Sequence, residues 1–123
     1  MLLELNQHIV NEIIADDPVR PHISAEWRLN DHREVYGLYS DESFEELRSV
    51  ICVAYTDEVP TCESDMNLLG SSVAVFYTVW SYDKGAGKDI VFAVAEHIQK
   101  NKLKVRKFVT LSPLTEMAKR FHL

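Results

Sequence analysis

Cysteine, long apolar runs and metal-ligand motifs are all scarce in this chain of 123 residues. Its two cysteines, Cys52 and Cys62, do not form a CxxC pair, so we expect no metal. Cysteines without partners are typical of a reducing compartment, and we expect a cytoplasmic protein. No apolar run approaches the roughly 20 residues that a membrane-spanning helix needs, so we expect no membrane contact.

Positive charge is scarce in the first two thirds of the chain and concentrated in the last third. Residues 1–83 contain 4 Lys and Arg against 16 Asp and Glu, whereas residues 84–123 contain 9 against 3. The acidic part argues against general nucleic-acid binding. The basic part begins at a short glycine loop. The alternative interpretation is that these charges only solubilise the surface.

The length and the 46% hydrophobic content indicate one globular domain over residues 1–123. We predict strands over residues 34–40, 48–56, 73–80 and 105–111, a helix over 2–15 within an amino-terminal helical segment 1–16, and a helix over 88–100. Residues 18–33 are predicted to be irregular and residues 57–70 to be a loop with one helical turn. Ser112 and Pro113 are predicted to open a last helix. This order is typical of a mixed α/β (α+β) domain whose central sheet is flanked by helices.

The most informative stretch runs from Val73 to Ile90. A β-branched and aromatic run meets Gly85-Ala86-Gly87, and a helical pattern begins at once. Because the first amides of a helix have no acceptor inside it and its dipole favours anions there, this order predicts a phosphate-binding loop. Lys84 and Lys88 flank the loop and can neutralise phosphate. The stretch matches neither the P-loop nor the Rossmann motif, and a tight turn without a ligand is the alternative.

Residues 34–123 resemble the GNAT acyltransferases. Their signature, [RQ]xxGxG/A between the fourth strand and the next helix, is matched at Gly85 and Gly87, with Tyr82 at the place of the Arg or Gln. The resemblance implies a GNAT fold with coenzyme A or an acyl-CoA held by the loop 80–88. The residues implied to bind it are Trp80, Tyr82, Lys84, Gly85, Ala86, Gly87 and Lys88. The family's AxxxY tyrosine, which protonates the leaving thiolate, corresponds to His122.

A narrower resemblance, to the catalytic domain of the malonyl-CoA decarboxylases, rests on HREVYGLYS, RSVICVAYT, VAVFYTVW, FVTLSP and the final RFHL. It implies two catalytic residues, Ser112 of the LSP motif and His122 of RFHL. These are ten residues apart here, whereas the decarboxylases have a long insertion between them. Ser112 before Pro113 is equally the pattern of a helix cap.

The resemblance leaves the activity open. An enzyme would be an acyltransferase or a carboxy-lyase similar to malonyl-CoA decarboxylase. The alternatives are a non-catalytic module that binds acyl-CoA or a partner, and a small α/β protein without coenzyme A. A GNAT sheet normally has two more strands than this sequence provides, so we expect an exposed sheet edge and a homodimer. An active protein should also show the strand before Gly85 parting from its neighbour.

Overall fold

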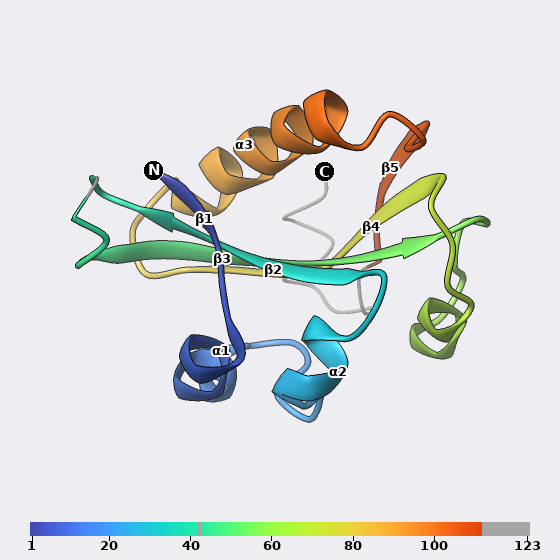
Figure 1. Cartoon of the computed structure of the whole chain (residues 1–123). Coiled ribbons are helices and arrows are strands. Elements are labelled where there is room, and N and C mark those ends of the chain that lie inside the picture. The colour runs from blue at the N-terminus through green and yellow to red at the C-terminus, as the bar shows by residue number, and fades with distance from the viewer. Residues whose placement is uncertain (42, 112–123) are drawn as a thin grey trace.

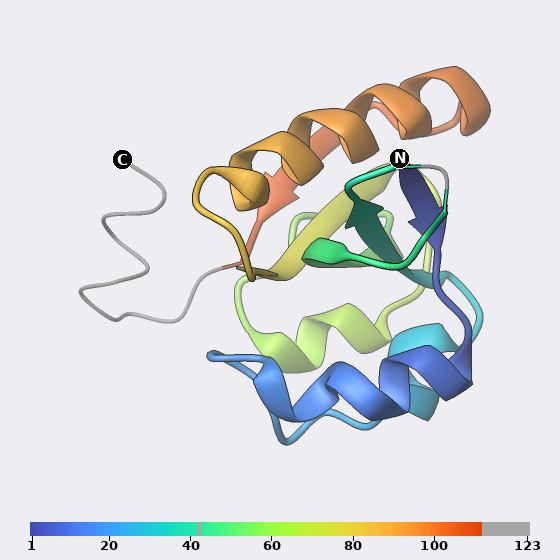
Figure 2. The same ribbon diagram turned by 90° about the vertical axis from the view of Figure 1, so that its left-hand side faces the viewer.

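The computed structural model describes residues 1–41 and 43–111. They form a five-stranded sheet in the order β1-β2-β3-β4-β5, with helix α3 over one face and α1 and α2 over the other (Figure 1, Figure 2). The elements are β1 (Leu2–Glu4), α1 (Gln7–Ile13), the 3-10 helix η1 (Ile14–Asp16), α2 (Ala25–Leu29), β2 (Arg33–Tyr39), β3 (Leu47–Thr56), the 3-10 helix η2 (Glu63–Asn67), β4 (Val73–Ser81), α3 (Ala86–Asn101) and β5 (Lys107–Thr110). Neighbouring strands are antiparallel except β4 and β5, which are parallel.

The central strand β3 is apolar on both faces, as its sequence predicts. Every second residue contributes to the core under α1 and α2, and the residues between them contribute to the core under α3. The first set is Val50, Cys52 and Ala54, and the second is Ile51, Val53 and Tyr55. The sheet therefore has two hydrophobic layers, one on each side of β3.

Helix α3 buries one stripe against the sheet. Ile90, Val94 and Ile98 are fully buried, and their spacing of four residues places them on one face. The predicted helix over 88–100 and the predicted strands over 34–40, 48–56 and 73–80 are confirmed, and η2 is the helical turn predicted within 57–70. The strand predicted over 105–111 is present but shorter.

The amino-terminal segment corrects the prediction of a helix over residues 1–16. Residues 2–4 form β1, which pairs Leu3 with Gly37 of β2, and α1 begins only at Gln7. Leu2 and Leu3 lie on opposite faces of the sheet, which a strand allows and a helical stripe does not. The side chain of Asn6 caps α1 by accepting a hydrogen bond from the amide of Ile9 at 3.0 Å.

The segment predicted to be irregular, residues 18–33, contains the short helix α2. The Ser24 side chain caps this helix by accepting a hydrogen bond from the amide of Trp27 at 3.1 Å. Trp27 is half-buried and packs against the core. The helix predicted after Ser112 lies outside the described residues.

Candidate functional site

The loop between β4 and α3 has the geometry of an anion site. Gly85 precedes the helix with φ of 83°, and a Cβ there would meet no atom within 4 Å. Glycine is therefore needed for the left-handed backbone and not for space. The amide of Ala86 donates to the carbonyl of Asp83 at 3.2 Å, but no described residue accepts a hydrogen bond from the amides of Gly87 or Lys88. These two amides lie at the positive end of the dipole of α3, where the helix has no acceptor of its own.

Arg48 of β3 connects the loop to the sheet through a hydrogen bond and ion pairs. Its carbonyl accepts a hydrogen bond from the amide of Tyr82 at 2.7 Å. Its guanidinium lies 3.1 Å from Asp83 of the loop and 3.6 Å from Asp89 in the first turn of α3, so it pairs with both carboxylates. The two lysines of the loop are exposed and form no ion pair with any described residue. Their charge remains to neutralise a bound anion.

Strand β4 continues past the point where β5 stops pairing with it. The parallel pairing ends at Phe76, whose carbonyl accepts a hydrogen bond from the amide of Leu111 at 3.2 Å, while β4 runs on to Ser81. Backbone N–H and C=O groups alternate in direction along a strand, and the amide of Tyr82 points toward β3. Those of Val79 and Ser81 therefore point away from β3, to the side where β5 no longer pairs with β4. Among residues 1–41 and 43–111, no strand covers this edge of β4. The open edge leads directly into the glycine loop.

A bulge in β4 lies where the two parallel strands part. The pairing with β3 shifts register so that Tyr77 opposes no β3 residue. Tyr77 and Thr78 consequently both point to the layer of α1 and α2, where the Thr78 hydroxyl donates to Asp17 at 2.9 Å. The carbonyl of Tyr77 accepts a hydrogen bond from the guanidinium of Arg20.

No protein-family model matches the chain, and no curated protein matches its sequence. Solved structures match nearly all of it. Malonyl-CoA decarboxylase from Agrobacterium vitis matches with TM-score 0.79 and 21% identity, over 99% of this chain and 35% of that one. A ribosomal-protein-alanine N-acetyltransferase from Brucella melitensis biovar Abortus 2308 matches with TM-score 0.66 and 16% identity, over 100% and 87%. An aminoglycoside N-acetyltransferase in complex with CoA matches with TM-score 0.58 and 16% identity, over 99% and 87%.

The chain has the GNAT fold. This confirms the fold that the resemblance to the GNAT acyltransferases implies, and also the mixed α/β class predicted from the order of the elements. The chain spans 35% of the length of the Agrobacterium vitis decarboxylase structure, so it corresponds to one part of that protein. In this GNAT domain the predicted strand–glycine–helix junction is the segment from β4 to α3.

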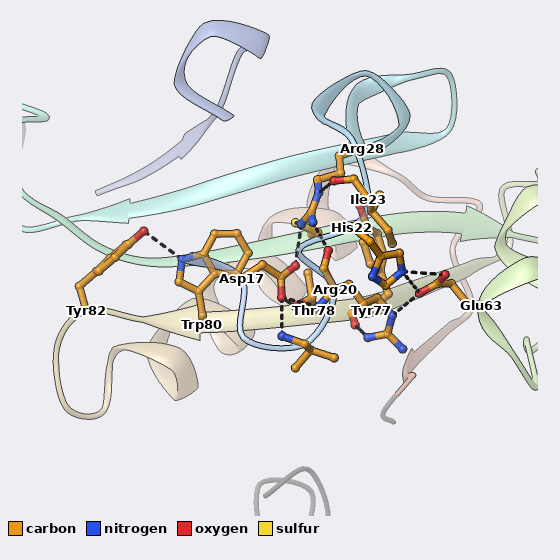
Figure 3. A network of polar contacts seen from close by, with 12 residues as sticks. Asp17, Arg20, His22, Ile23, Arg28, Glu63, Tyr77, Thr78, Trp80 and Tyr82 are labelled. Atoms are coloured by element: carbon orange, nitrogen blue, oxygen red, sulfur yellow. Dashed lines mark hydrogen bonds and ion pairs between the residues drawn. The ribbon is translucent and has the colours of Figure 1, made fainter. Parts of the chain in front are cut away.

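A buried polar network supports the GNAT domain's β4 bulge from the side of α1 and α2 (Figure 3). Asp17 accepts hydrogen bonds from the amides of Val19 at 2.8 Å and Arg20 at 2.9 Å and forms a 2.8 Å ion pair with Arg28. Both side chains of this pair are 0% exposed. Burial opposes ionisation of Asp17, but these donors together with Thr78 hold its pKa below its ordinary value. The connection between α1 and α2 is therefore anchored on β4.

The side chains of Trp80 and Tyr82 are turned toward η1. The indole N–H of Trp80 donates to the Tyr82 hydroxyl at 3.0 Å, and that hydroxyl donates to Asp16 at 2.7 Å. Burial and then the Asp16 carboxylate raise the pKa of Tyr82 to about 12, so the hydroxyl keeps its proton at neutral pH. Trp80 is buried and Tyr82 is half-exposed at the loop. Contact of these two side chains with coenzyme A stays a prediction.

The seven predicted coenzyme A residues lie at the end of β4, in the loop and in the first turn of α3, and their role in binding coenzyme A stays a prediction. Ser112 and His122 lie outside the described residues. Cys52 is fully buried, and burial raises the pKa of its thiol to about 11, which argues against a nucleophilic role. Within the part of the chain that the structure describes, no cluster of His, Cys, Asp and Glu could hold a metal, and no helix is long and apolar enough to cross a membrane.

The sequence did not predict the network around Asp17 or the role of Arg48. One signal was available, because all four basic residues among residues 1–83 are arginines. Three of them are buried, namely Arg20, Arg28 and Arg33. Arginine is the basic residue that most often forms buried ion pairs, and an acidic segment offers it many carboxylate partners. The pattern indicates internal pairing but does not identify the partners.

Proposed function

We propose that the protein binds coenzyme A or an acyl-CoA, with the pyrophosphate on the amides of Gly87 and Lys88. The observation that carries this proposal is the pair of first-turn amides without described acceptors, directly beside the open edge of β4. Lys84 and Lys88 would neutralise the phosphates. The match to an acetyltransferase in complex with CoA supports the assignment of the ligand.

The open edge of β4 would take the pantetheine arm. This arm is extended and contains two amide groups, so it can pair with a strand edge as an added strand does. Val79 and Ser81 would supply the N–H and C=O groups. The thioester would then lie toward Tyr77, where the bulge ends the continuous pairing of β4. The buried network under the bulge would exclude water from one side of this position.

We propose Ser112 and His122 as the catalytic residues of an enzyme with this ligand. The position of Leu111 supports this, because it is hydrogen-bonded to Phe76 where β4 and β5 part, and Ser112 follows it in the sequence. In a decarboxylase similar to malonyl-CoA decarboxylase, the Ser112 hydroxyl would stabilise the enolate oxygen and His122 would deliver the proton to carbon. In an acyltransferase, His122 would protonate the leaving thiolate of coenzyme A.

A non-catalytic acyl-CoA-binding module is the second candidate. Tyr82 favours it, because its hydroxyl is already engaged with Trp80 and Asp16 at the place where GNAT enzymes carry Arg or Gln. A homodimer formed through an exposed sheet edge belongs to this proposal. Its mass in solution would test it, and a monomer at all concentrations would exclude it. The two free cysteines support a location in the cytoplasm.

Turnover of acetyl-CoA and malonyl-CoA separates the two candidates. The enzyme proposal predicts release of carbon dioxide from malonyl-CoA or transfer of an acyl group to an amine. Ser112→Ala and His122→Ala should each reduce this turnover. The matched controls are Ser43→Ala and His8→Ala, which are both exposed and lie outside β4, the glycine loop and the segment after β5. Unchanged turnover in both test variants would show that the role assignment is wrong.

A further inference from the structure

A cavity of about 710 Å³ lies at the end of α3 opposite the glycine loop. Its lining includes Glu4 of β1, Glu34 of β2, Tyr55 of β3 and residues 101–105, which end and follow α3. The 16 residues of α3 separate this cavity from the loop by about 24 Å. The cavity is therefore distinct from the proposed coenzyme A site. Its volume is within the range of about 300–1,000 Å³ that small-molecule sites have.

Glu34 is the central polar group of the cavity. Its Oε1 accepts hydrogen bonds from the hydroxyls of Tyr55 at 2.5 Å and Tyr36 at 2.9 Å. Burial and the neighbouring Glu34 raise the pKa of both tyrosines, so both hydroxyls remain donors. The Glu34 side chain is only 16% exposed. Its carboxylate is consequently fixed in orientation, with Oε2 left for a further partner.

That partner is an ammonium group of the chain itself. The Nζ atom of Lys102 lies 3.5 Å from Oε2 of Glu34 and 5.0 Å from the centroid of the Tyr55 ring, which is within the range of a cation–π contact. Lys102 is the first residue after α3, so its ammonium also lies near the negative end of the helix dipole. Three independent features therefore favour a cation at one position.

Lys102 holds this position weakly and neutralises it incompletely. Its side chain is 38% exposed, and ion pairs of exposed lysines contribute little to stability. Burial and then the Glu34 carboxylate raise the pKa of Glu4, another acidic residue of the lining. The Lys102 ammonium acts on this pKa in the opposite direction and does not offset the combined effect of burial and Glu34.

We propose that this cavity binds a small aliphatic primary amine, whose ammonium group replaces that of Lys102 between Glu34 and the Tyr55 ring. The position between Glu34 and the Tyr55 ring already holds an –NH₃⁺ group, since Oε2 of Glu34 lies 3.5 Å from the Lys102 ammonium and the Tyr55 ring lies beside it. Apolar side chains of Leu29, Leu103 and Val105 line the same cavity and would contact the alkyl chain. Lys102 then acts as an internal competitor that an external amine must displace.

Calorimetric titration of the full chain with n-butylamine tests the proposal, with n-butanol as the neutral isostere. Lys102→Ala should bind n-butylamine at least tenfold more tightly than the wild type, because the competitor is removed. The matched control is Lys104→Ala, which makes the same change in net charge within the same lining and contacts no described carboxylate. It should bind as the wild type does, and n-butanol should produce no heat.

The second variant is Glu34→Gln in the Lys102→Ala background, which should lose at least tenfold in affinity for n-butylamine. Circular dichroism would first establish that this double variant is folded. Equal affinities of Lys102→Ala and Lys104→Ala would overturn the proposal, because they would show only general attraction of a cation to an acidic protein. Absence of heat with Lys102→Ala would overturn it as well. Neither result depends on the folding of the Glu34 variant.

Discussion

Replacement of Arg28 by Met removes the centre of the network that supports β4. The Arg28 guanidinium is completely buried and donates to the Asp17 carboxylate at 2.8 Å and to the carbonyls of Ile23 at 3.0 Å and Arg20 at 2.6 Å. Methionine keeps most of the volume, so the core loses little packing. What changes is that one buried carboxylate and two buried carbonyls lose a donor.

The expected loss follows from these three groups. Removing one partner of a buried ion pair costs about 3–5 kcal/mol. Asp17 still accepts hydrogen bonds from the amides of Val19 and Arg20 and from the Thr78 hydroxyl. The cost of leaving its carboxylate without Arg28 therefore lies at the lower end of that range. Each carbonyl left without its donor adds roughly 1 kcal/mol. We expect a total loss of about 5 kcal/mol in the free energy of unfolding at neutral pH.

Urea unfolding of Arg28→Met and Arg48→Met, followed by circular dichroism, measures this difference. Arg48 is the matched control because its ion pair with Asp83 is partly exposed, and such pairs contribute about 0–1 kcal/mol. A loss below about 1 kcal/mol for Arg28→Met, or equal losses for the two variants, would refute the reasoning. Asp17→Asn added to Arg28→Met should restore part of the stability, because it removes the unpaired charge.

Three further predictions concern acid pH, the loop and the contact with η1. The pKa of Asp17 in the folded protein lies below its ordinary value of 3.8, so the Asp17 carboxylate stabilises the fold above about pH 4. This stabilisation is lost as the pH falls through the folded-state pKa. The urea concentration at the unfolding midpoint should therefore fall over this interval, and it should fall less in Asp17→Asn than in the wild type. Gly85→Ala should cost about 1–2 kcal/mol in thermal unfolding because φ is positive, and Gly85→Asn should cost less; equal losses would contradict this. Tyr82→Phe deprives the indole of Trp80 of its acceptor and should cost about 1 kcal/mol, measured in urea, whereas no loss would exclude that contact as stabilising.

The sequence predicted those elements in which local pattern and tertiary environment agree. Strand β3 is apolar at every position from Val50 to Ala54, and its short length and β-branched residues favour a strand buried on both faces. Helix α3 repeats its apolar residues at a spacing of four, and Gly85 marks its start. The residues of the glycine loop were found for the same reason, because helix geometry alone determines where unpaired amides must lie.

The sequence failed where distant partners decide the structure. Leu2, Leu3 and Leu5 have a spacing that suits both a helix and a strand, and pairing with β2 decides for the strand. The Asp17–Arg28 pair joins residues from a segment without periodicity to Thr78 of β4, which is 61 residues away from Asp17. The cavity around Glu34 likewise combines β1, β2, β3 and the end of α3, and no local motif signals it.

The central claim is that the first amides of α3 bind the pyrophosphate of coenzyme A. Calorimetric titration of coenzyme A into the wild type, Lys88→Met and Lys88→Pro tests it most directly. Met removes only the charge, whereas Pro also removes the amide, which lies in the first turn of α3 and has no described acceptor. We predict saturable binding to the wild type and a further loss of about tenfold or more for Pro relative to Met, as expected for a hydrogen bond to a charged group. No heat with the wild type, or equal affinities of the two variants, would contradict the account.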